Sequence, residues 1–328
     1  MTKILHLLPL LLLLLFSSCS INRMAINAVS DALTGTDSGN VFSSDPDPEL
    51  VGDALPFAIK MYEALLDSNP NHQGLILTTG SLFIMYANAF VQTPAEMLPA
   101  HHFAERSAAN ERAKMLYLRG VDILYRDFDN RFPGFSTSHQ DGSYGRHLAR
   151  MRKQDVPLLY WTVAGNMAAF ALDPFNLALG QRIPKLTAML QRAYELDPDF
   201  NNGALDEFYI LFYGSLPELM GGNKELAEKH FRIALEKNRG LSAGTYLSYV
   251  RAIAIPAQDY DTFKEYLGLA LAIDVDADPP NRLVNILSQR TAAHLLSHAS
   301  DIFFLLDDDD WDDDWDDWVD EDLEFDEE

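Results

Sequence analysis

The segment that decides the fold reads ELAEKHFRIALEKN and spans residues 225–238. Small side chains at Ala227 and Ala234 flank one large ring at Phe231, at steps of four and then three residues. Side chains at these steps share one face of an α-helix. The small residues let a neighbouring helix approach closely, and the ring fills the space beside them. The segment therefore predicts a helix that packs closely against other helices.

The same order of small and large residues recurs elsewhere, as in a repeat protein. Partial matches occur at Ala58, Tyr62, Leu65 and Pro70, at Ala193 and Pro198, and at Ala270 and Asp274. The last three units lie about 40 and 36 residues apart, near the roughly 34 residues of a tetratricopeptide repeat. We predict degenerate tetratricopeptide-like helical hairpins that stack into a curved array, whose concave face suits a peptide or a partner helix.

The body, residues 49–306, is predicted to be all-α and a single domain. Apolar residues recur at three- and four-residue steps, alternating strand patterns are scarce, and no Gly/Ser linker divides it. One long irregular loop is predicted over 130–145. We predict helices over 49–67, 72–91, 99–129, 156–172, 182–195, 202–216, 223–238, 241–255, 259–273 and 280–299.

Residues 1–18 are predicted to be a lipoprotein signal peptide. Lys3 precedes an apolar core of about a dozen residues, too short to span a bilayer. Small residues then lead into Cys19, the only cysteine, in the order of a bacterial lipobox. An ordinary secreted protein with a chance cysteine is the alternative. We expect lipid attachment at Cys19 and a flexible tether over 19–48, which is rich in Gly, Ser, Asp and Pro near its end.

The last residues, 307–328, are predicted to form an acidic tail. Sixteen of the 22 are acidic and none is basic, within a chain of net charge −24. This balance argues against nucleic-acid binding. We predict a disordered, solvated tail in the free protein. If the tail folds as a helix, Trp311, Trp315 and Trp318 form one aromatic stripe that would dock on a basic, apolar groove of a neighbouring subunit or a binding protein.

Seven stretches of the body, taken in order, resemble the T components of tetratricopeptide-repeat-associated TRAP transporters (TatT). They are AIKMYEALLDSNPNHQGL (58–75), MYANAF (85–90), KMLYLRG (114–120), DVPLLYW (155–161), LQRAYELDPDF (190–200), SLPELMGGNKELAEKHF (215–231) and RLVNILSQRTAAHLL (282–296). The resemblance stops near Phe304, so the acidic tail departs from the family.

This resemblance implies a periplasm-facing, lipid-anchored and all-helical protein of the cell envelope, with a central cleft or pore. It also implies a homotrimer that pairs with a periplasmic substrate-binding protein, the P component. The implied ligand is a small, partly apolar molecule such as an organic acid. Whether the inner or the outer membrane holds the anchor is left open.

Six residues are candidates for lining a ligand cleft: Tyr117, Arg119, Tyr160, Trp161, Asn285 and Arg290. Arg119 lies among apolar residues in the sequence, so it is expected to be buried and paired, with Asp122 or another carboxylate. The alternative is that its guanidinium receives a ligand carboxylate. Tyr160 and Trp161 fit either the core or a cleft for apolar ligands with a polar end.

No catalytic constellation stands out, and both HExxH and a phosphate-binding Gly loop are missing from the sequence. We therefore predict no enzyme activity and no cofactor. His294 and His298 have a spacing that can bind metal, but no third ligand is evident, so no metal is predicted. A transport accessory is the favoured function. The alternative is a repeat-protein scaffold lipoprotein for envelope protein assembly, without a ligand.

Overall fold

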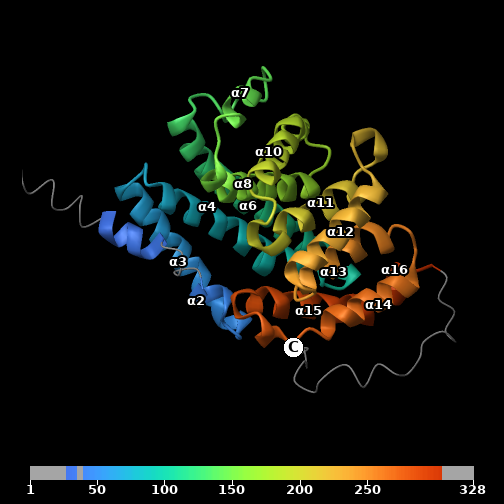
Figure 1. The fold of residues 1–328 in the computed structure, drawn as a ribbon. Coiled ribbons are helices and arrows are strands. Elements are labelled where there is room, and N and C mark those ends of the chain that lie inside the picture. The colour runs from blue at the N-terminus through green and yellow to red at the C-terminus, as the bar shows by residue number, and fades with distance from the viewer. Residues whose placement is uncertain (1–26, 35–39, 305–328) are drawn as a thin grey trace, which may run out of the picture. The chain divides into compact units, whose positions relative to one another are not determined.

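The computed structural model describes residues 27–34 and 40–304, and every regular element in this part of the chain is helical (Figure 1). The prediction of an all-α protein is therefore confirmed. The chain forms two compact units, and the boundary between them lies between Asp197 and Pro198. The predicted single domain over 49–306, the repeats and the central cleft stay predictions.

The first unit has five main helices, which are α3 (Pro48–Ser68), α4 (Gln73–Ala87), α6 (Phe103–Arg131), α8 (Val156–Leu172) and α10 (Ile183–Leu196). Its short helices are α2 (Asn40–Ser43), α5 (Thr93–Glu96), α7 (Tyr144–Leu148) and α9 (Leu177–Gly180). The second unit contains α11 (Ala204–Ser215), α12 (Lys224–Asn238), α13 (Ala243–Tyr249), α14 (Tyr260–Leu271), α15 (Arg282–Ser297) and α16 (Ala299–Ile302). The helix predicted over 156–172 coincides with α8, and the other predicted helices match to within a few residues at most ends.

Polar residues placed just before the helices explain where these helices start. The side chain of Asp47 accepts a hydrogen bond from the backbone N–H of Leu50 at the start of α3. Asn223 does the same for α12, and Asp259 for α14. Each cap satisfies one of the four backbone donors that a helix start leaves unpaired, a contribution of about 1 kcal/mol.

Glycine lets the three central helices of the first unit approach closely, with backbone contact between α4 and α6. A Cβ atom on Gly120 of α6 would lie 2.6 Å from the carbonyl oxygen of Gly80 on α4. Gly165 of α8 similarly leaves room for Ile84 and Val121, which a Cβ would meet at 2.7 and 2.8 Å. The core of this unit therefore requires glycine, which has no side chain, where these helices cross.

A helix from the segment predicted as a tether packs on the first unit. Residues 27–34 are helical, and the Leu33 carbonyl accepts a hydrogen bond of 2.8 Å from the Tyr62 hydroxyl on α3. Asp31 lies 3.0 Å from the ring of His72, and Ser30 is fully buried. Over its described residues, the segment therefore contributes contacts to the body.

A long loop follows α6, in agreement with the irregular stretch predicted over 130–145. It runs as successive turns from Phe132 to α7. The ammonium group of Lys185, on α10, reaches into this loop and donates hydrogen bonds to the carbonyls of Phe135 and Ser136, the latter at 3.2 Å. Burial lowers the pKa of Lys185 to about 7. The loop is thus pinned to a helix some fifty residues further along the chain.

In the second unit, α12 is the closely packed helix that residues 225–238 predict. Ala227, Phe231 and Ala234 of α12 are all buried, in one cluster with Ile210 of α11. Between the two helices, Gly221 has a φ of +99°, a value that favours glycine. At the neighbouring Gly222, a Cβ would lie 1.7 Å from a backbone oxygen, so this position also requires glycine.

One continuous helical stretch, Gln73–Glu96, is long and apolar enough to cross a membrane, with a mean hydropathy of 1.5. Half of its most apolar window is buried inside the unit. It packs against α6, so its apolar residues form protein core. We interpret it as the central helix of the first unit.

Substituting Gly120 by alanine tests the backbone contact. The added methyl group has to displace the α4 backbone, and overpacking of this kind costs about 1–3 kcal/mol. We expect Gly120→Ala to lower the melting temperature by about 3–10 °C in calorimetry. Gly145→Ala is the matched control, because a Cβ at Gly145 meets no atom within 4 Å. Equal melting temperatures for the two variants would contradict the proposed contact.

Candidate functional site

Tyr117 is a core residue of the first unit. Its ring is fully buried, and its hydroxyl donates a hydrogen bond of 2.7 Å to Gln92 and accepts one of 3.3 Å from Asn88. Both partners belong to a single π-helical turn, η1 (Asn88–Gln92), which follows α4. Burial raises the pKa of the phenol well above its usual range. Tyr117 therefore ties α6 to this wide turn as a neutral hydroxyl.

Arg119 is exposed, so the expectation that it is buried was wrong. Half of its side chain surface is accessible, and its partner is the carboxylate of Glu63 on α3 rather than Asp122. The guanidinium also lies 4.8 Å from the centre of the Phe83 ring. Arg119 lies two positions after buried Tyr117 on α6, which is enough to turn it toward a different face of the helix.

The pairing keeps Glu63 charged. Partial burial works against ionisation, but hydrogen bonds from Lys60 and Arg119 hold the pKa of Glu63 below its ordinary value. Asp122 shows the opposite balance, because burial raises its pKa more than Arg182 and Arg126 lower it. One side of the Arg119 guanidinium is paired with Glu63, and its other N–H groups are accessible to a second carboxylate.

Tyr160 and Trp161 form a half-buried aromatic pair near the start of α8. Their ring centres lie 5.3 Å apart in an edge-to-face arrangement. Neither ring is fully enclosed, so both can contact the core with one side and a ligand with the other. This geometry is compatible with either interpretation of the pair.

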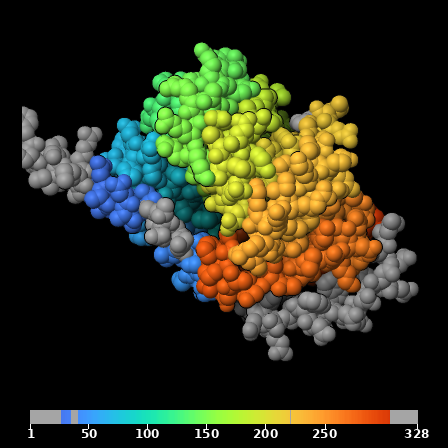
Figure 2. Space-filling model, viewed as in Figure 1, coloured from blue at the N-terminus to red at the C-terminus, as the bar shows by residue number. Residues whose placement is uncertain are grey.

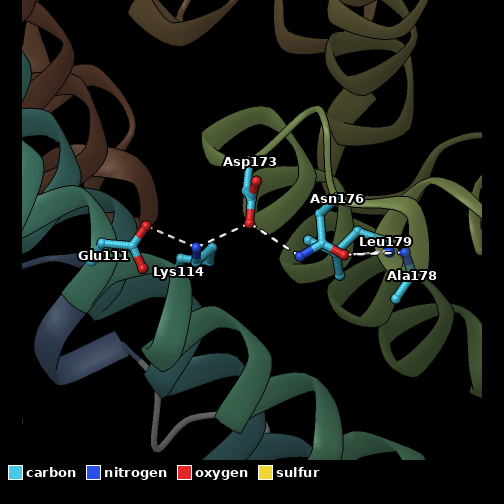
Figure 3. A network of polar contacts seen from close by, with 6 residues as sticks. All are labelled: Glu111, Lys114, Asp173, Asn176, Ala178 and Leu179. Carbon is cyan, nitrogen blue, oxygen red and sulfur yellow. Dashed lines mark hydrogen bonds and ion pairs between the residues drawn. The ribbon is translucent and has the colours of Figure 1, made fainter.

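A polar network joins α6 to the turn after α8 (Figure 3). Lys114 lies 2.8 Å from Glu111 and 3.1 Å from Asp173, and Asn176 donates to the same Asp173 oxygen. The side-chain oxygen of Asn176 in turn accepts hydrogen bonds from the backbone N–H groups of Ala178 and Leu179 and so caps α9. Hydrogen bonds from Asn176 and Lys114 lower the pKa of Asp173, so this charge is stabilised. Sequence reasoning missed this network because its members lie about sixty residues apart.

Asn285 has a structural role in the second unit. It is almost fully buried, its oxygen accepts a 3.0 Å hydrogen bond from the Ala243 N–H, and its amide nitrogen donates to the Leu241 carbonyl at 2.9 Å. Both amide atoms thus hold the start of α13 against α15. Arg290 is half-buried further along α15. These two candidates belong to the second unit, whereas the other four belong to the first.

A buried acidic network in the second unit was not foreseen. Asp206 is fully buried and lies 2.6 Å from the ring of His230 and 2.7 Å from the Lys237 ammonium group. Glu207 beside it accepts hydrogen bonds from the hydroxyls of Ser242, at 2.6 Å, and Thr245. Burial raises the pKa of Glu207, and the two hydroxyls offset this only in part. These carboxylates connect α11 to α12 and α13.

The histidine pair at the end of α15, Cys19 and the tail tryptophans are the remaining residues that the sequence singled out. His294 and His298 stack with ring centres 4.1 Å apart, and a His298 ring nitrogen contacts the His294 carbonyl. Within residues 27–34 and 40–304, no group of three or more His, Cys, Asp or Glu side chains is placed to hold a metal ion. Cys19 and the tail tryptophans Trp311, Trp315 and Trp318 lie outside the described residues.

The raised pKa of Glu207 predicts a pH-dependent effect of Glu207→Gln. A group whose folded-state pKa is raised contributes stability that is fully present below the unfolded pKa and is lost as pH rises through the folded pKa. Glutamine accepts the same two hydrogen bonds without an ionisation. We therefore expect the melting temperature of Glu207→Gln, relative to the unmodified protein, to increase from pH 4 to pH 8.

Exposed Glu236 on α12 provides the control, since Glu236→Gln also removes one negative charge. Its melting curve is expected to follow that of the unmodified protein across the same pH range. Parallel curves for Glu207→Gln and the unmodified protein would contradict the role assigned to Glu207.

Comparison with known proteins places the chain in a family. The sequence pattern of the TRAP transporter T-component family (TAtT) matches residues 44–303, a range that extends over parts of both units. An uncharacterized protein of Treponema pallidum (strain Nichols) is 38% identical over 305 residues, covering 88% of this chain and 94% of that protein. The chain therefore belongs to the TRAP transporter T-component family, a family of transport accessories.

Proposed function

We propose that the protein is a lipid-anchored component of a TRAP transport system that faces the periplasm, docks a substrate-binding P component and handles a small organic acid. The family match over residues 44–303 is the observation that carries this proposal. The sequence at the N-terminus supports the anchor, because a short apolar core is followed by small residues and Cys19. A homotrimer belongs to the same proposal.

Arg119 supports an acidic ligand. Its guanidinium is half-exposed, and it is oriented from two sides by Glu63 and by the ring of Phe83. A guanidinium held in this way presents its remaining N–H groups in a fixed fork, which matches a carboxylate. Tyr160 and Trp161 provide a half-buried aromatic surface in the same unit.

The scaffold without a ligand remains the second candidate. It is favoured by Tyr117 and Asn285, since both were candidates for the cleft and both use their polar atoms inside the protein. The two functions differ in whether a small molecule accompanies the protein through purification. Detection of a bound small molecule therefore distinguishes the two functions.

Affinity capture of the purified protein, followed by mass spectrometry of bound proteins and small molecules, tests the transport function. We expect a periplasmic binding protein and a small organic acid, and we expect Arg119→Met to reduce the recovered acid at least tenfold. Arg126→Met is the matched control, because Arg126 is another exposed arginine of α6. Recovery of partner proteins without any small molecule would favour the scaffold.

Replacement of Cys19 tests the anchor. Cys19→Ala removes the thiol that would carry the lipid, and multiple acyl chains are what make such anchoring stable. We expect the variant to leave the membrane fraction and the detergent phase, while Ser20→Ala stays in both. Unchanged partitioning of Cys19→Ala would rule out lipid attachment at this residue.

A further inference from the structure

A group of arginines gathers around the loop after α6, on an otherwise acidic protein. Arg131, Arg150 and Arg152 line a hollow of about 600 Å³ together with Phe132. Arg146 and Arg150 line a second hollow, of about 520 Å³. Because Arg150 borders both, the two hollows adjoin. We call these four arginines with Phe132 the arginine surface.

The arginine surface is held in place from beneath. Arg131 lies 2.6 Å from Asp127 and 2.5 Å from Asp155, and both carboxylates are nearly buried. The guanidinium groups of Arg131 and Arg150 lie 5.5 and 5.3 Å from the centre of the Phe132 ring. The loop itself is pinned by Lys185. The surface is therefore largely preorganised for a partner, which reduces the ordering cost of binding.

Three of the arginines present their charge to solvent. Arg146, Arg150 and Arg152 are exposed, and within the described part of the chain no carboxylate forms an ion pair with any of them. Figure 2 shows the green segment that carries them at the molecular surface. Two carboxylates, Asp155 and Asp141, also line the hollows, and the nearby Arg146 helps to lower the pKa of Asp141. In a chain with 49 acidic and only 25 basic residues, four arginines around two carboxylates are a local reversal of charge. Such a surface suits an anionic partner.

We propose that the arginine surface binds the acidic tail, residues 307–328, of a second copy of this protein. The tail offers the two groups to which a guanidinium binds best. Its carboxylates match the fork of the guanidinium, and the faces of Trp311, Trp315 and Trp318 accept a stacked cation. The two hollows are open and adjoin, which fits an extended acidic peptide better than a single small anion.

We take the tail from a second copy, because the tail follows the second unit in sequence whereas the arginine surface belongs to the first. Binding between copies places no condition on how the two units of one chain are arranged. The contact joins two different surfaces, so repetition of it closes into a ring or continues as an open chain. The 24 residues after Phe304 are long enough to span about 80 Å when extended.

Co-purification of two differently tagged full-length copies tests the proposal. One variant carries Arg146→Gln, Arg150→Gln and Arg152→Gln, and the other has every Asp of residues 307–320 replaced by Asn. We expect unmodified copies to associate and expect association to weaken as salt is raised. Each variant should associate with itself at least tenfold more weakly. A mixture of the two variants should recover association, because each pair keeps one intact surface and one intact tail.

The control carries Arg112→Gln, Arg126→Gln and Arg232→Gln, three exposed arginines that are not part of this surface, and makes the same change in charge. It should associate as the unmodified protein does. Failure of the mixed variants to associate would overturn the proposal, as would normal self-association of the Arg146, Arg150 and Arg152 variant. Tryptophan fluorescence distinguishes binding within one chain. If the unmodified protein is monomeric, and its tail emission changes on substitution of the arginines but not with protein concentration, the tail binds within its own chain and the proposal is overturned.

Discussion

The first unit depends on the approach of α4, α6 and α8 at glycine. At Gly80 and Gly120 the two backbones come so close that a single Cβ would reach the opposite carbonyl. Close packing at this crossing brings the apolar faces of all three helices into one core, and the contact cannot be widened without loss along the whole interface. The positions of Tyr117 and Arg119 follow from it, because both lie within one turn before Gly120 on the same helix. Tyr117 faces the core, and Arg119 faces solvent.

The second unit uses a different means to connect its helices. Small residues of α12 pack against α11, but two carboxylates, Asp206 and Glu207, also lie at the start of α11 and reach the two following helices. Buried polar groups of this kind cost stability when unpaired and fix a unique arrangement when fully paired. Here the contacts of Asp206 join α11 to α12, and those of Glu207 join α11 to the start of α13.

Charge is distributed unevenly over the protein, and this bears on its partners. The tail concentrates acid, whereas the loop after α6 concentrates exposed arginine beside Phe132. Arg119 is a separate cationic position, with its own carboxylate partner and its own aromatic neighbour. The first of these positive regions suits an extended polyanion, and the second suits a single carboxylate. The two regions thus support different interactions of one transport accessory.

Local sequence patterns were sufficient to predict the fold class, most helix boundaries and the loop after α6. These features depend on residues that are close in the chain, such as a cap three positions before its donor or an apolar step of three or four. The tertiary structure alone decided that Arg119 is exposed and pairs with Glu63, that Asn285 holds α13, and that Gly120 meets Gly80. In each case the partner lies about forty or more residues away, and nothing in a local pattern specifies which distant residue will complete a contact.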